Sequence, residues 1–228
     1  MKQKIQIRCK NNKKSQKVEI GSTLFDVFSS FDLKMTHGPV SARVNNKVEG
    51  MHYRVYNSKD VEFLDMNSAS GSRAYTRTLF FVLCKAVQDI YPNTDVVIDI
   101  PVSNGFYVDI RLGRPVVDED VNILRRRMQE IIDSKIPIRR FTVPTEEAIA
   151  LFQEKGDVEK VKLLRTSGSI YTTYYKIGEY VDYYYGTLLT NTSQLYLFGL
   201  EKYYDGMLLR IPSVSNPDEL GEMTRQDK

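Results

Sequence analysis

The spacing of hydrophobic residues changes once along this chain, close to residue 70, and that change limits the folds that the chain can adopt. Before it, short segments alternate apolar and polar residues, as at Ile5, Ile7 and Cys9. After it, residues 75–91 place Leu79 and Leu83 on one helical stripe that Pro92 stops. Period two is typical of a half-buried strand, and period 3.6 of an amphipathic helix. The pattern predicts an α+β protein with two domains.

The first part reads as two strands, a helix and further strands. Strands are predicted at residues 4–9 and 17–20, followed by a helix that Ser22 or Thr23 can cap. A hairpin signal at Asn45-Asn46 separates two more predicted strands, residues 41–44 and 52–56, and a last one follows at residues 61–65. This order is that of a β-grasp domain, as in ubiquitin, and we assign it residues 1–64.

The second part mixes helices with strands. A small polar stretch, residues 65–72, is the expected linker, and residues 73–212 are the second domain. After the first helix come strands at residues 95–100 and 105–110. Further helices are expected from Asp118 and from Thr145, and short aromatic strands from residue 169 onward. Residues 213–228 show no periodicity and are predicted to be a linker or tail.

Two features bear on location and partners. The two cysteines, Cys9 and Cys84, are far apart in sequence and no apolar run is long enough for a membrane, which favours a reducing, cytoplasmic location and no membrane partner. Residues 1–20 hold seven basic side chains against one acidic. Lysines protecting an edge strand are the favoured interpretation. The alternative is an RNA surface, with contacts from Lys10, Lys13, Lys14 and Lys17.

Familiar cofactor motifs are missing from the sequence. No glycine precedes a lysine, so there is no phosphate-binding P-loop, and no two glycines are two residues apart, as a dinucleotide fingerprint would need. His37 and His52 are predicted to be solvated loop residues, and the second part has Cys84 as its one soft ligand. We expect no metal and no cofactor in this chain.

The order of short motifs is more informative than any one of them. They run "YP", "GFYVDI", "DEDVNILRRRMQEII", "FQEKGDVEKVKLL", "EYVDYYYG" and "LLRIP". Over residues 3–212 the chain resembles the N-terminal region of threonyl-tRNA synthetases. There a β-grasp module, the TGS domain, precedes the editing domain that is shared with alanyl-tRNA editing proteins.

The resemblance implies that the editing site has been lost. In the family, two histidines spaced H-x-x-x-H and a later cysteine and histidine form that site. Alignment on Tyr91-Pro92 and on Tyr180-Val181-Asp182 places these four groups at Arg77, Phe81, Tyr184 and Leu188. We therefore expect no catalytic residue. A packed core is the favoured interpretation of these positions. The alternative is a pocket for an anionic or planar ligand, lined by Arg77, Tyr107, Asp182 and Tyr184.

The same pair of domains also resembles the N-terminal part of certain bacterial uridine or nucleoside kinases. That resemblance implies a non-catalytic regulatory or binding region whose partner is a C-terminal kinase domain of the same polypeptide, with ATP and Mg²⁺ as the cofactors of the whole protein. Two alternatives stay open. One is an RNA- or tRNA-binding module, with Arg125-Arg126-Arg127 as further contacts, and the other, ranked last, is an active editing hydrolase.

Overall fold

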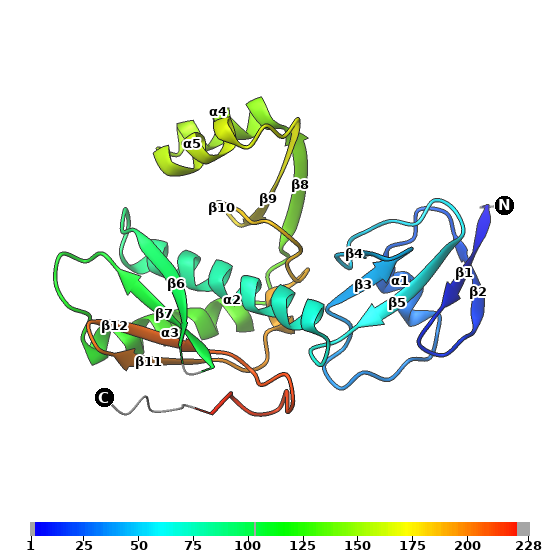
Figure 1. Ribbon diagram of the computed structural model, residues 1–228, viewed down its shortest axis with the longest axis horizontal. Coiled ribbons are helices and arrows are strands. Elements are labelled where there is room, and N and C mark those ends of the chain that lie inside the picture. The colour runs from blue at the N-terminus through cyan, green and yellow to red at the C-terminus, as the bar shows by residue number, and fades with distance from the viewer. Residues whose placement is uncertain (1–2, 103, 223–228) are drawn as a thin grey trace.

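The computed structural model describes residues 3–102 and 104–222 of the chain. Its first part is a mixed five-stranded sheet in the order β2-β1-β5-β3-β4 (Figure 1). The strands are β1 (Lys4–Cys9), β2 (Ser15–Glu19), β3 (Ser41–Val44), β4 (Lys47–Glu49) and β5 (Lys59–Leu64). The central pair, β1 and β5, is parallel and the neighbouring pairs are antiparallel. Helix α1 (Leu24–Ser29) packs Leu24 and Val27 into the core of this sheet. The β-grasp prediction is confirmed.

One strand of the first part lies elsewhere than the sequence predicted. Asn45 and Asn46 have φ angles of 44° and 75°, the left-handed geometry of a two-residue hairpin turn. The partner of β3 is therefore β4, which starts directly after the turn. The prediction of a strand at residues 52–56 was wrong. Val55 in that segment is fully buried, and its backbone bonds Gly21 and Ser22 instead of a sheet strand.

The second part is built on the long helix α2 (Ala69–Ile90). Ser68 caps it by accepting the N–H of Gly71. Residues 69–72, which were expected in a linker, are thus the first turn of the helix. A Cβ on Gly71 would lie 1.9 Å from the carbonyl oxygen of Asp65, so only glycine permits this close approach. The domain limits at residues 64 and 73 remain predictions.

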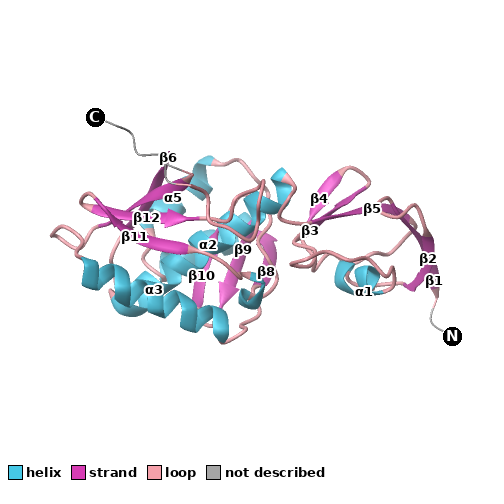
Figure 2. Ribbon diagram, turned by 90° about the horizontal axis from the view of Figure 1, so that it is seen from below, coloured by secondary structure: helices cyan, strands magenta, loops and turns pink. Residues whose placement is uncertain are grey.

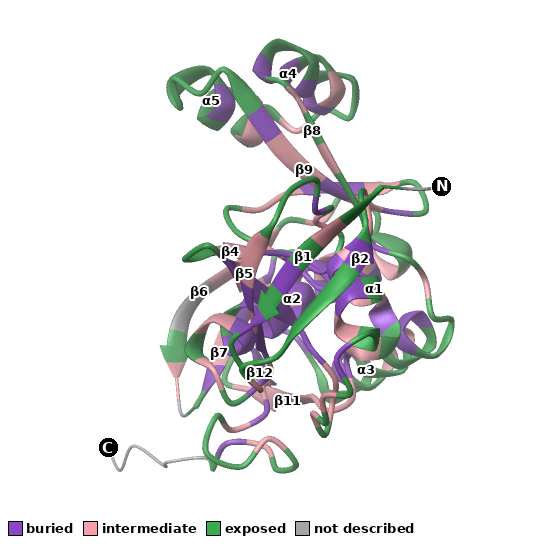
Figure 3. Cartoon of the chain, turned by 90° about the vertical axis from the view of Figure 1, so that its right-hand side faces the viewer, coloured by how far each residue is buried: buried purple, intermediate pink, exposed green. Residues whose placement is uncertain are grey.

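A four-stranded antiparallel sheet packs against α2 in the order β11-β12-β7-β6. Its strands are β6 (Val96–Val102), β7 (Gly105–Ile110), β11 (Gly199–Tyr203) and β12 (Gly206–Arg210). Helix α3 (Asp118–Asp133) lies beside α2 and contacts β11 (Figure 2). Leu83, Val108, Leu124 and Leu209 belong to the shared core, and Figure 3 shows the buried residues concentrated around α2.

A three-stranded sheet and two helices project beyond α2 (Figure 1), and we call residues 139–183 the arm. The sheet has β9 (Tyr171–Ile177) between β8 (Arg139–Pro144) and β10 (Tyr180–Tyr183). Helices α4 (Thr145–Glu154) and α5 (Val158–Thr166) connect β8 to β9 and share a small core with the arm sheet through Phe152 and Leu164. The sequence did not predict β8. A short 3₁₀ turn, Thr192–Gln194, follows the arm.

The described part of the predicted tail has a definite structure. Pro212 and Leu220 form an isolated β-bridge, and Ser213 N–H donates to the carbonyl of Glu219. The carbonyl of Gly221 accepts from Arg210 of β12 at 2.7 Å. Residues 213–222 therefore fold back on the sheet instead of extending away from it. Residues 223–228, the rest of the predicted tail, lie outside the described residues.

This C-terminal segment also joins the two parts of the chain. The His37 ring, from the first part, stacks on Tyr196 with 3.6 Å between ring centroids. Asp218 lies 2.7 Å from His37 Nε2, and the hydroxyl of Tyr196 donates to the carbonyl of Pro217. The prediction of a solvated His37 was wrong, because the tail covers it.

Candidate functional site

The four editing positions lie together between α2 and the segment after β10. Arg77 and Phe81 are one helical turn apart on α2. The rings of Phe81 and Tyr184 meet edge to face, with 5.8 Å between centroids. Leu188 is 2% exposed and belongs to the same core as Phe81. The hydroxyl of Thr78, on α2, holds this segment by accepting the N–H of Leu189 at 2.9 Å.

Tyr184, the middle member of the tyrosine run, is packed among groups that leave it no role as a base. Its neighbours include Phe81, Cys84 and Asp182. Burial raises the pKa of Tyr184 well above its usual value, and the nearby thiol and carboxylate raise it further. Burial likewise raises the pKa of Cys84 to about 12. Both groups keep their protons at neutral pH, so neither serves as base or nucleophile.

Arg77 holds the turn that follows Tyr184. Its Nη1 donates to the carbonyl of Thr187 at 3.0 Å. Gly186 has a φ of 111°, and a Cβ there would lie 2.7 Å from Arg77 Cζ. Glycine is thus required both by the backbone and by the guanidinium. Burial lowers the pKa of Arg77, and Arg73 lowers it further, but an arginine keeps its charge at neutral pH.

Asp182 is the centre of a buried ionic network that the sequence did not reveal. Its Oδ1 lies 3.0 Å from Lys160 Nζ and accepts the N–H of Tyr183 at 2.7 Å. Its Oδ2 accepts from the hydroxyl of Tyr180 at 2.9 Å. Lys160 also pairs with Asp157, the N-cap of α5, at 2.7 Å. The one sequence signal for Lys160 was its position three residues after a capping aspartate.

Tyr107 does not join the other members of the predicted pocket. It lies on β7, where Tyr107↔Leu208 pairing directs its ring away from the α2 side that Val108 occupies. Its ring packs near Tyr203 with 6.3 Å between centroids and covers Gly206, whose Cβ would meet it at 2.7 Å. The prediction of a pocket shared by Tyr107 and Arg77 was wrong, because β-strand alternation places Tyr107 on the opposite face.

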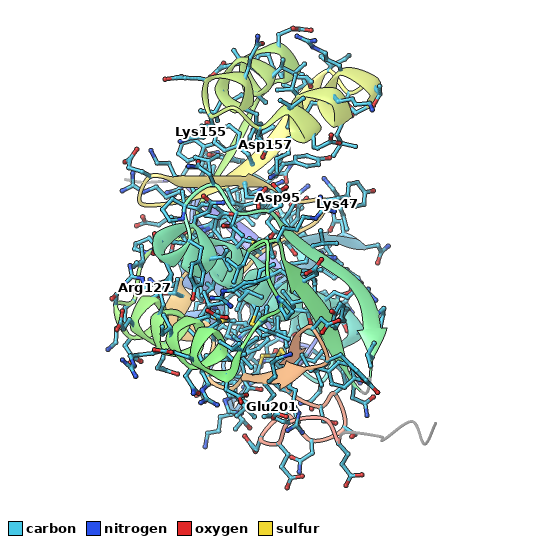
Figure 4. The ribbon with its side chains drawn as sticks, turned by 90° about the vertical axis from the view of Figure 1, so that its left-hand side faces the viewer. Lys47, Asp95, Arg127, Lys155, Asp157 and Glu201 are labelled. Atoms are coloured by element: carbon cyan, nitrogen blue, oxygen red, sulfur yellow. The ribbon has the colours of Figure 1, made fainter. Side chains whose placement is uncertain are left out.

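A cavity of about 430 Å³ lies between the end of α2 and the arm. Lys85, Gln88 and Asp89 line it from α2, while the arm contributes the residues on its inner side, among them Lys155 and Asp157, labelled in Figure 4. Lys85 pairs with Asp89, and Lys160 pairs with Asp157 and Asp182. The lining has three lysines and three acids. They are Lys85, Lys155 and Lys160, and Asp89, Asp157 and Glu179. The lining therefore carries little net charge to select an ion.

The described residues contain no group of three or more His, Cys, Asp or Glu side chains that could hold a metal. His52 bonds the carbonyl of Ile138 through Nε2, and burial lowers its pKa. Cys9 and Cys84 are both free. No helix in the part of the chain covered by the structure is long and apolar enough to cross a membrane.

The lysines proposed to contact RNA lie on the hairpin of β1 and β2. Lys10, Lys13, Lys14 and Lys17 are all exposed. Lys17 pairs in register with Gln6, and Lys13 has a left-handed φ of 60° in the turn. The other proposed cluster is partly neutralised, because Arg127 holds Asp89 and Glu130 at 2.9 Å each.

The comparison with known proteins points to one group of enzymes. The chain is 30% identical to the threonine–tRNA ligase of Acetivibrio thermocellus over 181 residues, which is 79% of this chain and 28% of that enzyme. It is 29% identical to the enzyme of Clostridium kluyveri over 192 residues, 83% of this chain and 30% of that enzyme. No family model matches the chain.

The chain is related to the N-terminal region of threonine–tRNA ligases. A third relative, the ligase of Azobacteroides pseudotrichonymphae, is 28% identical over 224 residues and aligns with 92% of the chain. The chain spans about a third of the length of these relatives, at most 35%. The matched portion is the TGS and editing region, in agreement with the α+β architecture.

Proposed function

We propose that this chain is a non-catalytic binding or regulatory region derived from the TGS and editing region of a threonine–tRNA ligase. The observation that supports this most strongly is the content of the editing positions. They bring together a phenyl ring, a phenol and an isobutyl group in one core, and a half-buried guanidinium that donates to the carbonyl of Thr187. Hydrolysis of an ester at neutral pH needs a water activated by a metal or by a base of suitable pKa. These groups supply neither.

A deacylation assay with mischarged tRNA tests this proposal. The chain is expected to give no turnover above the uncatalysed rate. A matched variant that combines Arg77→His, Phe81→His, Tyr184→Cys and Leu188→His returns the family's groups to the same backbone positions. Turnover by the unaltered chain that disappears in Tyr184→Phe would overturn the proposal. Turnover only in the fourfold variant would support it directly.

The same reasoning predicts that the purified, untagged chain binds no zinc. The positions that hold ligands in the family, Arg77, Phe81, Tyr184 and Leu188, offer no imidazole and no thiol. Metal analysis is expected to give far less than one zinc per chain. A stoichiometric content that survives dialysis would contradict the absence of a ligand set.

The wider setting that we propose is a nucleoside kinase, with a uridine kinase as the leading candidate. This rests on the order of the two domains, together with an editing site that has no catalytic groups. In that setting the partner is a kinase domain of the same polypeptide, and ATP and Mg²⁺ act there and not in this chain. The full-length protein is expected to phosphorylate uridine with ATP, while residues 1–228 alone do not. A full-length protein without this activity would refute the kinase setting and leave the non-catalytic assignment in place.

The second candidate function is RNA binding through the β1–β2 hairpin. The observation that favours it is that Lys10, Lys13, Lys14 and Lys17 are exposed and form no ion pair among the described residues. Binding of this kind is weak and salt-dependent, because it comes from neutralised phosphates. Reversal of Lys13, Lys14 and Lys17 to glutamate is expected to abolish binding to a tRNA at low salt. Affinity that survives both the reversal and high salt would exclude this electrostatic mechanism.

A further inference from the structure

Arg77 and Arg140 approach the turn at residues 185–187, and Arg73 lies beside Arg77. Arg73 and Arg77 lie one helical turn apart on α2, and Arg140 lies on β8 of the arm. Arg140 is opposite Tyr175 in the strand register, and the hydroxyl of Tyr175 donates to the carbonyl of Gly186 at 2.9 Å. Arg77 contacts the same glycine. The turn is therefore approached by positive charge from two separate elements.

These charges are less closely paired with carboxylates than those of several other arginines in the protein. Arg77 is half-buried, and no carboxylate of the described residues lies within 4.0 Å of it. Arg73 donates to Ser70 Oγ at 3.2 Å. Arg140 Nη1 lies 4.0 Å from Glu49 Oε2 and shares this carboxylate with Lys47, which lies 3.0 Å from Oε1. By contrast, four arginines elsewhere hold a carboxylate oxygen within 2.9 Å, namely Arg43, Arg114, Arg127 and Arg210.

A half-buried guanidinium without a counter-charge costs free energy, because it loses part of its hydration and no carboxylate compensates for that loss. Arg77 also stands next to the like charge of Arg73, and these two effects lower its pKa. The same positive charge acts on Tyr175. Burial raises the pKa of Tyr175, while Arg140 and Arg77 both lower it. The site is thus positive before anything binds. An anion placed beside the turn would supply the missing counter-charge.

An aromatic ring stands next to this positive site. Tyr185 directly precedes Gly186 and is 90% exposed. An exposed tyrosine ring offers a flat apolar face on which a nucleobase stacks. Of the five N–H groups of Arg77, one donates to the carbonyl of Thr187. Guanidinium groups match the oxygens of a phosphate better than ammonium groups do.

We propose that Arg73, Arg77 and Arg140 bind the phosphate of a nucleoside monophosphate whose base stacks on Tyr185. A small anion is favoured over an RNA strand because the positive charge is confined to one turn and Glu49 borders it on the side of the first domain. The proposal does not rest on the kinase setting. It concerns an anion site in this region, whatever the rest of the polypeptide does.

Calorimetric titration of the chain with uridine 5′-monophosphate tests the site. Uridine and inorganic phosphate serve as partial ligands, and a ten-nucleotide oligouridine tests RNA. Uridine monophosphate is expected to bind more tightly than either partial ligand. Arg73→Gln and Arg140→Gln should each weaken it about tenfold, the effect of losing one charge-assisted contact. Arg165→Gln removes the same charge from an exposed position on α5 and should leave binding unchanged.

A second pair of variants separates Arg77 from its role in the turn. Gly186→Ala keeps every charge but forces the guanidinium away, since the new Cβ would overlap it. It should weaken binding as much as Arg77→Gln does, whereas Arg77→Lys should recover part of it. The proposal is refuted if uridine monophosphate fails to bind at millimolar concentration, if uridine binds equally well, or if only the oligouridine binds. Equal weakening by Arg165→Gln would also refute it.

Discussion

Asp120 is a buried carboxylate with several hydrogen-bond and ionic partners. Its side chain is 3% exposed in the first turn of α3. Arg114 holds its two oxygens at 2.6 and 2.8 Å, the hydroxyl of Tyr91 donates at 2.7 Å, and the N–H of Val117 at 2.9 Å. These donors hold the pKa of Asp120 well below its usual range. The sequence placed this aspartate in a predicted helix, but it did not reveal the arginine and tyrosine that pair with it.

The pH dependence of stability follows from the direction of that shift. Because the folded pKa is lowered, the carboxylate stabilises the protein above an unfolded pKa of about 3.9, and this contribution is lost as the pH falls towards the folded pKa. Asp120→Asn should lower the free energy of unfolding by about 1–3 kcal/mol at pH 7. The difference from the unaltered chain should shrink below about pH 4. Urea denaturation across pH measures it, with exposed Asp118→Asn as the control. A difference that stays constant with pH would contradict this assignment.

At the scale of elements, the arm depends on the contact between α5 and β10. Lys160 spans the two by pairing with Asp157 and Asp182. Asp182 is 6% exposed. Removal of Lys160 therefore leaves a buried carboxylate that has hydrogen-bond donors but no counter-charge. Lys160→Met should destabilise the protein by about 1–3 kcal/mol and speed hydrogen exchange in β10.

The control for this prediction is Lys162→Met, an exposed lysine on the same helix. A double variant, Lys160→Met with Asp182→Asn, removes both charges and should recover part of the loss, because the unpaired charge is then absent. If Lys160→Met matches Lys162→Met in stability and exchange, the ionic network does not hold the arm.

The elements that the sequence predicted well are those whose hydrophobic pattern and end signals agree. Helices α2 and α3 have long apolar stripes, and β6 and β7 flank a turn at Asn104-Gly105, so their types were confirmed. The strand expected at residues 52–56 alternates correctly, but its buried faces pack beside residues 21–24 and not in a sheet. β8 was missed because Arg139 and Arg140 are exposed and leave little apolar alternation. The local pattern of apolar residues does not indicate which distant segment a strand will pair with.

The residues of the candidate site could be predicted only where the resemblance to threonyl-tRNA synthetases aligned them. Sequence order brought out Arg77, Phe81, Tyr184 and Leu188, and these do lie together. Lys160 could not be found, because its carboxylate partner Asp182 is 22 residues away along the chain and meets it only through the fold of the arm.

At the scale of the whole molecule, the tail fixes the first part against the second. His37 of the first part stacks on Tyr196 of the second part and pairs with Asp218 of the tail. Tyr196→Leu removes the stacked ring and the bond to Pro217, and Asp218→Ala removes the ion pair. Both should raise hydrogen exchange in residues 33–40 and 213–221, with a larger effect for Tyr196→Leu.

Glu219→Ala is the matched control, since it removes an acidic side chain from the same segment without touching His37. Small-angle scattering should report a wider spread of molecular dimensions in Tyr196→Leu than in this control. Unchanged exchange and scattering in both His37-contact variants would mean that the junction is held without the tail.

The strand order has a consequence for how the chain is made. β1 pairs with β2 at once, but its other edge waits for β5, so the first part can close only when residue 64 has left the ribosome. The four-stranded sheet is completed much later, because β7 pairs with β12 and the entire arm is synthesised between these two strands. Throughout that interval β7 presents an open edge and α2 an apolar stripe to the solvent. Translation that slows after the arm prolongs this exposure, so the yield of folded protein is set by how quickly residues 199–210 follow.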